Sequence, residues 1–359
     1  MASSISAGTT SSTGLVATAD TSGALVLQTN NGTTAITLDT SQNATFVGYA
    51  NLPNTFGFKN RIINGAMVID QRNAGASITN LVGNLFSVDR WGTNGSQASK
   101  FTVQQNAGSV TPPTGYRNYL GVTSSSAYTV GSTEAFYLYQ GIEGFNTYDL
   151  AWGTANAQSI TLSFWVRSSL TGTFGGSLFN DTANYSYPFS YTISAINTWE
   201  QKTITIAGPT AGTWTTNNTV GIWISLNIGA GSTLLGTANT WAGSFYRAPT
   251  GATSIIGTNA ATFYITGIQL EKSSIATSFD YRSYGTELAL CLRYYQTLPG
   301  IIVNPAASWV SITYVTPMRA NPTVSGGGGG FTIDTASVYV GNFYQSSRAA
   351  QTITLSAEL

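Results

Sequence analysis

The chain has 359 residues, of which 42% are hydrophobic and only 8% charged, and its formal net charge is zero. An average globular protein carries roughly 25% charged residues, so Ser, Thr, Asn, Gln and Gly must supply the polar surface here. The hydrophobic content is enough for a core and argues against disorder. Balanced charge without a basic patch argues against nucleic-acid binding, which needs Lys and Arg to neutralise phosphates.

The cysteine count and the first residues of the chain limit the cellular compartments in which we expect the protein to fold. A single cysteine, Cys291, excludes an intrachain disulfide, so the chain can fold in a reducing cytoplasm. The first 18 residues lack a basic region followed by an apolar run, so we expect no signal peptide. No stretch approaches 18 consecutive apolar residues, so we expect no membrane insertion.

Residues 1–56 are predicted to form a thin N-terminal stalk. Short apolar runs follow one another in a Ser/Thr/Gly-rich background: Leu25-Val26-Leu27, Ala35-Ile36-Thr37-Leu38 and Thr45-Phe46-Val47. Asn30-Asn31-Gly32 between the first two is a strong hairpin signal. Such short strands are marginal alone, which favours intertwining with other copies of the chain. Residues 1–13 are instead expected to be a disordered leader.

Residues 57–282 are predicted to form an all-β body. Apolar strand candidates alternate with Gly/Asn/Thr-rich turns: residues 101–103, 135–139, 160–166, 191–193, 203–206, 220–226 and 261–270. In the run that starts at Ile160, the side chains of Ile160, Leu162, Phe164 and Val166 fall on one face at period two. That alternation is typical of a half-buried antiparallel strand. Many short strands with such turns favour an antiparallel jelly-roll sandwich.

Residues 283–359 are predicted to form a small, mainly β C-terminal unit with one short helix. Glu287 to Gln296 places Leu288, Cys291, Leu292 and Tyr295 on one apolar stripe. Cys291 on that stripe is predicted to be a buried structural thiol. Strands are expected at residues 309–315, around Phe331, at 338–340 and at 352–355, with a glycine loop at 326–330.

Three groups of motifs resemble phage virion proteins of the tail-fibre and tail-collar-like kind. They are residues 25–39 with Ser41-Gln42-Asn43; residues 59–67 with Asp70-Gln71-Arg72 and Ser87-Val88-Asp89-Arg90-Trp91; and residues 267–272, 276–280 and 290–296 with Ala357-Glu358-Leu359. The body also resembles carbohydrate-binding jelly-roll modules through Ser163-Phe164-Trp165-Val166-Arg167 and Asn197-Thr198-Trp199-Glu200.

The resemblance implies a homotrimeric fibre that joins other virion proteins through its N-terminal segment and contacts the host surface. It also implies assembly in the host cytoplasm and an extracellular location after lysis.

Residue chemistry argues against an enzyme. The chain has no histidine, which removes Ser-His-Asp and Cys-His nucleophile systems and most zinc sites. A glycosidase needs two carboxylates roughly 5 to 10 Å apart. The candidates are Glu134, Glu143, Asp149 and Asp181, and turn or capping roles explain them as well. Asp89 is expected to pin the first strand through an ion pair. No compact carboxylate cluster predicts a metal site, and no cofactor is expected.

Sugar binding has more support from the residues present. Exposed aromatic rings stack on sugar faces, while amides and carboxylates form hydrogen bonds with sugar hydroxyl groups. Aromatic residues in three turn-like segments are the candidates, and each has core packing or a trimer contact as its alternative role. The predicted carbohydrate-binding residues are Tyr148, Trp152, Tyr185, Tyr187, Trp241 and Tyr246, with Phe145 and Phe245 beside them and Asn146, Asn180, Asp181 and Asn184 as polar partners.

The sequence therefore predicts a non-enzymatic phage fibre subunit that adheres to host surface polysaccharide. Two alternatives stay open. One is a purely structural virion component, such as a head fibre, capsid decoration or tail adaptor. The other is a glycan-degrading tail spike.

Overall fold

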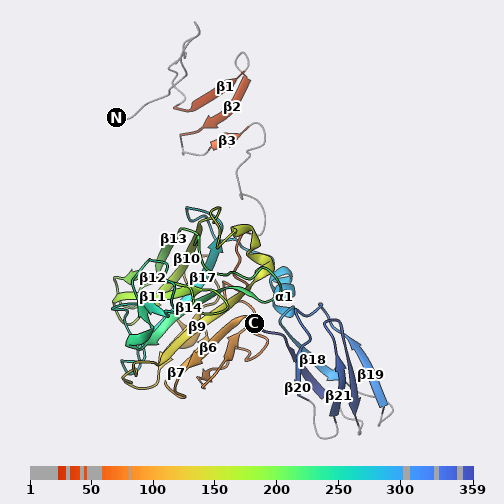
Figure 1. Cartoon of the computed structure of the whole chain (residues 1–359). Coiled ribbons are helices and arrows are strands. Elements are labelled where there is room, and N and C mark those ends of the chain that lie inside the picture. Colours follow the sequence, from red (N-terminus) through yellow and green to blue (C-terminus); the bar gives the residue numbers. More distant parts are fainter. Residues whose placement is uncertain are drawn as a thin grey trace. The chain divides into compact units, whose positions relative to one another are not determined.

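The computed structural model describes residues 23–29, 33–40, 44–46, 59–80, 82–301, 308–326, 331–345 and 351–359. The chain divides into two compact units, Met1–Thr55 and Phe56–Leu359 (Figure 1). No helix in these described ranges is long and apolar enough to cross a membrane.

The described residues of the first unit form a small antiparallel sheet. Its strands are β1 (Leu25–Thr29), β2 (Thr33–Leu38) and β3 (Ala44–Phe46), in the order β1-β2-β3. Leu25 pairs with Leu38 across β1 and β2, so the predicted strands and their antiparallel pairing are confirmed. The predicted turn at residues 30–32 and the leader at 1–13 lie outside the described residues.

Two six-stranded sheets form the body. Sheet I has the order β13-β10-β17-β8-β7-β4, and sheet II has the order β12-β11-β14-β9-β6-β5, with antiparallel pairing throughout. Sheet I comprises β4 (Ile78–Thr79), β7 (Phe101–Gln105), β8 (Leu120–Ser124), β10 (Ile160–Ser168), β13 (Glu200–Ile206) and β17 (Thr262–Glu271). Sheet II comprises β5 (Leu85–Val88), β6 (Trp91–Gly95), β9 (Ala135–Glu143), β11 (Gly172–Phe179), β12 (Ser186–Ile193) and β14 (Val220–Ala230).

The hydrophobic core lies between these two sheets. From β10 it receives the four predicted side chains of Ile160, Leu162, Phe164 and Val166, each at most 1% exposed. From sheet II, alternate residues of β9 and β14 join them, among them Phe136, Leu138, Ile222, Ile224 and Leu226. Full burial of one such side chain contributes about 1.5–3 kcal/mol, so the shared core fixes which face of each strand points inward. The predicted all-β, jelly-roll sandwich is confirmed.

A long connection between β14 and β17 crosses the outer face of sheet II. It contains η4 (Ser232–Leu234), β15 (Leu235–Gly236) and β16 (Ala248–Pro249), and the two strands pair in parallel. β16 packs against β11 and β12. Gly175 on β11 permits this approach, because a Cβ atom there would lie 2.5 Å from the Pro249 ring. Three further 3-10 turns, η1 (Ala107–Ser109), η2 (Gly144–Asn146) and η3 (Tyr148–Leu150), connect strands of the body.

The described residues of the C-terminal region form one helix and two three-stranded sheets around a small core. The helix is α1 (Tyr284–Leu292), and the sheets have the orders β18-β23-β20 and β19-β22-β21. The strands are β18 (Tyr295–Ile301), β19 (Ser308–Thr313), β20 (Thr323–Gly326), β21 (Phe331–Ala336), β22 (Val340–Gln345) and β23 (Gln351–Ser356). Phe343, Ile353 and Leu355 are fully buried there. The predicted boundary between residues 282 and 283 stays a prediction.

The predicted helix at residues 287–296 is wrong at both ends. The helix begins at Tyr284 and ends at Leu292, after which Tyr295 pairs with Ser356 and opens β18. Ladder hydrogen bonds to β23 are available only in the folded chain, and they override the local helical pattern. Cys291 is fully buried as predicted, and burial raises the pKa of its thiol well above the ordinary value.

Candidate carbohydrate-binding surface

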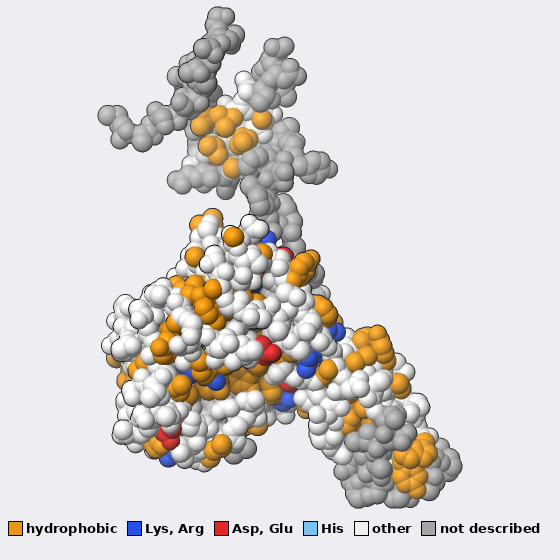
Figure 2. Space-filling model, in the orientation of Figure 1, with side chains coloured by type: hydrophobic (Ala, Val, Ile, Leu, Met, Phe, Trp, Pro, Cys, Tyr) orange, Lys and Arg blue, Asp and Glu red, His pale blue; other side chains and the backbone are white. Residues whose placement is uncertain are grey.

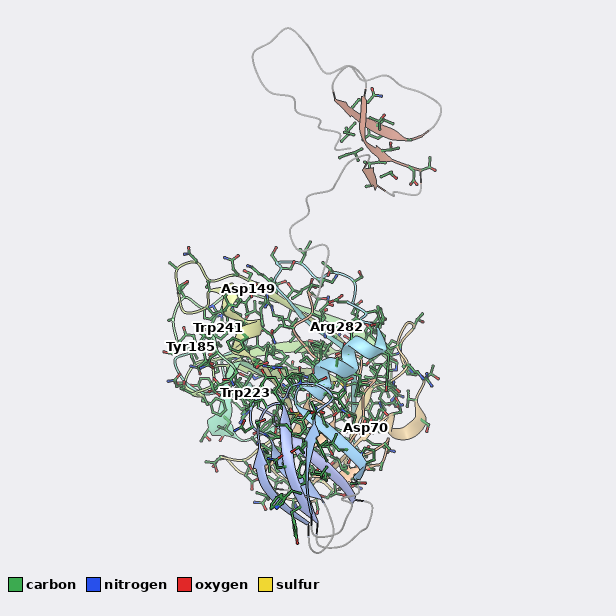
Figure 3. The ribbon with its side chains drawn as sticks, turned by 90° about the vertical axis from the view of Figure 1, so that its right-hand side faces the viewer. Asp70, Asp149, Tyr185, Trp223, Trp241 and Arg282 are labelled. Carbon is green, nitrogen blue, oxygen red and sulfur yellow. The ribbon has the colours of Figure 1, made fainter. Side chains whose placement is uncertain are left out.

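Four of the six predicted sugar-binding aromatics gather in one cluster, the aromatic plug. It consists of Trp152, Tyr185, Tyr187 and Trp241, together with Trp214, which the sequence pattern did not single out. The centroids of the Trp152 and Trp214 rings are 4.8 Å apart, and Tyr185 stacks on Trp241 at 5.7 Å and 21°. Figure 3 shows Tyr185 and Trp241 together, with Trp223 apart from them.

The plug mainly extends the core. All three indole N–H groups donate to backbone carbonyls: Trp152 to Gln158, Trp214 to Ala211 and Trp241 to Ala207, at 2.7–3.1 Å. Trp152 and Tyr187 are only 8% and 7% exposed, which leaves no open ring face for a sugar. For these two residues burial favours the core-packing alternative, and their predicted sugar-binding role stays a prediction. Tyr185 and Trp241 are half-buried, and their predicted role stays a prediction.

The other two predicted residues are not members of the plug. Tyr148 is 67% exposed and borders a cavity of about 220 Å³ with Trp152 and Trp214. Tyr246 packs against the backbone of Gly236, where an added Cβ would lie 2.5 Å from its ring. The six predicted carbohydrate-binding residues therefore include one exposed ring, that of Tyr148, and several rings that pack against other parts of the protein.

A second group of rings, which the sequence pattern did not single out, covers the outer face of sheet II. We call it the aromatic face, and its members are Tyr137, Tyr139, Phe179 and Trp223. Side chains alternate along a strand, so these rings point away from the core into which Phe136, Leu138 and Ile222 point. Strand register brings the rings together. Phe179 on β11 pairs with Trp223 on β14, and Trp223 also pairs with Gly141 on β9, two residues after Tyr139.

The rings of the aromatic face touch one another in a continuous series. Tyr137 and Tyr139 have centroids 5.8 Å apart, Tyr139 and Trp223 5.6 Å, and Trp223 and Phe179 6.2 Å with an interplanar angle of 18°. Tyr137 and Trp223 are half-buried, whereas Tyr139 and Phe179 are buried beneath their neighbours. Figure 2 shows a recessed band of hydrophobic side chains crossing the body between polar rims.

Small and amide side chains complete this surface. On β6, Gly92 lies under the Tyr139 ring, where a Cβ would approach ring atoms to 2.3 Å. Ser177 and Ser225 pair between β11 and β14 in the next row. Asn94 pairs with Tyr137 and donates to the Oδ1 of Asn84 at 2.7 Å. Ser177 and Ser225 are fully buried, so the amides of Asn84 and Asn94 are the groups beside these rings that a sugar hydroxyl can bond.

The connection between β14 and β17 adds a wall to the aromatic face. Phe245 lies edge-on to Phe179 at 5.0 Å, and the Arg247 guanidinium carbon lies 3.9 Å from the Tyr137 ring centre. Paired backbone hydrogen bonds between Ala242 and Ser186, and one from Arg247 N–H to the Leu234 carbonyl, fix this wall. A fixed wall lowers the conformational entropy that a ligand must remove on binding.

Glu134 and Glu143 do not form a hydrolytic pair. Glu134 precedes β9 and Glu143 ends it, and a nine-residue strand spans roughly 26 Å, well beyond the separation that glycosidases use. Glu143 is 2% exposed and bonds Arg293 and the Tyr294 hydroxyl at 2.6 and 2.9 Å. Asp149 pairs with Arg61 at 2.8 Å.

Asp181 is exposed on a turn. Within the described residues, no group of three His, Cys, Asp or Glu side chains is placed to hold a metal ion.

Several of the motifs for which the sequence analysis noted a resemblance meet where the body contacts the C-terminal region. The Asn60 side chain donates to the Ile268 carbonyl and accepts from Leu270 N–H, at 3.0 and 3.1 Å. The indole of Trp91 donates to the Asn64 carbonyl at 3.1 Å. These motifs, scattered along the sequence, therefore bind one another.

A buried ionic network lies at the same place. Glu358 accepts from both Arg72 and Arg90, and the Arg90 guanidinium carbon lies 3.6 Å from the Tyr294 ring centre. The expected ion pair of Asp89 is made with Arg72 at 3.7 Å, but its shorter contact is the hydrogen bond from Gln71 N–H at 2.7 Å. The motif residues thus stabilise the fold rather than line the aromatic face.

A signal for the aromatic face was present in the sequence. A strand with one solvent-exposed face should carry polar residues at every second position. In β9 the outward positions carry Tyr137 and Tyr139, and in β14 one of them carries Trp223. Rings at positions that should be polar indicate a surface that is covered or that binds a ligand.

No family model matches the sequence, and no curated protein matches it. Similar solved structures include an enzymatically active domain of bacteriophage CBA120 tailspike protein 4, at 12% identity and a TM-score of 0.32, covering 59% of this chain and 21% of that one. A putative sugar-binding protein from Bacteroides thetaiotaomicron has 11% identity, a TM-score of 0.34 and coverages of 60% and 100%. A family 11 carbohydrate-binding module from Clostridium thermocellum has 11% identity, a TM-score of 0.28 and coverages of 56% and 98%. At these values neither family membership nor a ligand is transferred to this chain.

Proposed function

We propose that the chain is a virion fibre subunit that binds host surface glycans on the aromatic face of sheet II. The observation that carries the proposal is that the half-buried rings of Tyr137 and Trp223 lie on the side of the sheet opposite the core, in contact with the buried rings of Tyr139 and Phe179. Rings on a strand's outer face cost stability in water unless something covers them, and sugar faces suit them because their C–H groups pack on rings while their hydroxyls bond amides.

The virion role is supported by the motif resemblance, and adhesion by a fibre is physically reasonable for weak sites. Several copies that contact a repeated polysaccharide gain avidity of about 10² to 10⁴ without new contacts. A homotrimer attached through residues 1–56 would supply that multiplicity, and its location would be the virion.

The test is binding of the purified full-length protein to a glycan array and to surface polysaccharide extracted from candidate hosts. The Trp223→Ala variant should bind at least about tenfold more weakly, because loss of one central ring costs about 1.4 kcal/mol or more.

The matched control is Trp165→Ala. Trp165 is also half-buried and lies on the outer face of the opposite sheet, between the inward-pointing Phe164 and Val166. The control variant should bind like the wild type. Equal losses in both variants, or no binding by a well-folded wild type, would favour a purely structural virion component. Release of reducing sugar would instead indicate a glycan-degrading spike.

A further inference from the structure

Arg247 is a charged side chain on the wall of the aromatic face, with rings on several sides. Its guanidinium carbon lies 3.9 Å from the ring centre of Tyr137, 4.6 Å from that of Phe245 and 4.9 Å from that of Phe179. One terminal nitrogen donates to the Tyr137 hydroxyl at 3.0 Å. Rings stabilise a cation, but they offer no in-plane acceptors for its remaining N–H groups.

Four other arginines of the body pair with carboxylates, whereas Arg247 and Arg167 have no carboxylate partner among the described residues. Arg61 pairs with Asp149, Arg72 and Arg90 pair with Glu358, and Arg282 pairs with Glu287. Among the described residues no carboxylate lies within ion-pairing distance of Arg247.

Burying the Arg247 guanidinium costs desolvation free energy. Burial lowers the pKa of Arg247, and neighbouring Tyr137 acts in the opposite direction. An arginine nonetheless stays protonated at neutral pH, so the positive charge is kept at a desolvated position without a counter-charge from the described protein.

We propose that Arg247 binds the carboxylate of an acidic sugar residue, such as a uronic acid, whose ring rests on the aromatic face. This deepens the proposed glycan binding and depends on it. The planar guanidinium presents paired N–H donors that match the two oxygens of a carboxylate. The Tyr137 ring beneath Arg247 contacts Tyr139, and Tyr139 contacts the half-buried Trp223. A sugar that stacks on Trp223 can therefore place its carboxylate beside the guanidinium.

The wall favours a fixed position for this charge. The backbone N–H of Arg247 donates to the Leu234 carbonyl at 2.8 Å, and the next residue, Ala248, pairs with Leu235 in the short parallel β15–β16 ladder. A pre-positioned guanidinium loses little conformational entropy when the anion binds.

The experiment uses the full-length protein and pairs of oligosaccharides that differ in one group. Oligogalacturonate, oligomannuronate and sialylated oligosaccharides are each compared with their carboxyl-reduced counterparts by isothermal titration calorimetry. For at least one pair, the wild type should bind the acidic form about tenfold more tightly, the effect expected of a hydrogen-bonded charge pair. Arg247→Gln should remove that preference, so that the acidic and the reduced forms bind the variant with affinities within about twofold of each other.

Two further variants separate recognition from folding. Arg247→Lys keeps the charge but loses the planar pair of donors, so it should retain only part of the preference. Arg167→Gln is the matched control: its guanidinium lies 5.4 Å from the Tyr264 ring centre on sheet I, and it should keep the full preference. Circular dichroism melting verifies that every variant is folded.

The outcomes distinguish the two proposals. Equal affinity for acidic and reduced forms, or a preference that survives in Arg247→Gln, overturns the role of Arg247 and leaves glycan binding intact. Absence of binding to every neutral and acidic glycan overturns glycan binding on the aromatic face, and the role of Arg247 with it.

Discussion

At the scale of single residues, Asp89 is a carboxyl group whose burial controls how stability responds to pH. Its side chain is 1% exposed, and desolvation raises its pKa from 3.8 to about 6, although Gln71 N–H and Arg72 act in the opposite direction. Between these two values the folded protein binds more protons than the unfolded chain. The free energy of unfolding therefore falls as pH rises through this window.

We expect the wild type to lose on the order of 3 kcal/mol of stability between about pH 4 and pH 6.5 through this group. The chain has no histidine, so few other groups titrate in the upper part of that window. Asp89→Asn should flatten the dependence in urea unfolding measured across the pH range. Asp181→Asn, on an exposed turn, is the control and should keep the wild-type slope. An unchanged slope in Asp89→Asn would contradict the assignment.

At the scale of elements, strand β9 has a structural carboxylate next to each end. Glu134, the residue before the strand, accepts hydrogen bonds from the Tyr128 hydroxyl and Gly131 N–H near the surface. Glu143, the last residue of β9, is enclosed and bonds Arg293 and Tyr294, which directly follow α1. The hydrogen bond from Arg293 to Glu143 also raises the pKa of the arginine. Glu143 thus ties sheet II to the C-terminal region.

Replacing Glu143 by Gln should destabilise the protein by about 2 kcal/mol, because the buried partner of Arg293 loses its charge while Arg293 keeps some access to water. Calorimetry should show a lower Tm, and limited proteolysis should cut more readily after α1. Glu134→Gln, at the other end of the strand, should leave both readouts near wild type. If Glu143→Gln abolished a glycan-hydrolysing activity at unchanged Tm, the structural role would be wrong.

At the scale of the whole molecule, the small β1-β2-β3 sheet raises the question of what covers it. Successive side chains of a strand point to opposite faces, yet Leu25, Val26 and Leu27 are 45%, 40% and 40% exposed. Both faces of β1 are therefore apolar and open within the first unit. A sheet of this size cannot bury enough area to be stable alone, which favours association with other copies of the chain.

We expect the full-length protein to have the mass of three chains in light scattering at micromolar concentration. Val26→Asp places a charge on one of the exposed apolar faces and should shift the protein toward monomers, with a large loss of avidity for polysaccharide. Val315→Asp is the control, since Val315 is 73% exposed after β19 and lies outside the first unit. A wild type that is monomeric at these concentrations would refute the trimer.

Much of the architecture was determined by local sequence pattern. The alternation of Ile160, Leu162, Phe164 and Val166 specifies one buried face whatever the partners are, because strand side chains have period two. The same holds for most long strands of the body, for the burial of Cys291 and for the antiparallel pairing of β1 and β2. Scarcity of charge and absence of histidine likewise limit the available chemistry without any coordinates.

Tertiary structure alone decided which aromatic rings are available. Tyr148 and Trp152 lie four residues apart in one turn-like segment and look equivalent in the sequence. In the folded chain Trp152 is buried whereas Tyr148 is open, because packing against Trp214 and Trp241 from distant loops covers one ring and not the other. The aromatic face and Arg247 likewise depend on register across β11, β14 and β9 and on a connection laid over them. Local pattern encodes which side of a strand is apolar, whereas contacts between segments far apart in the chain determine what each side meets.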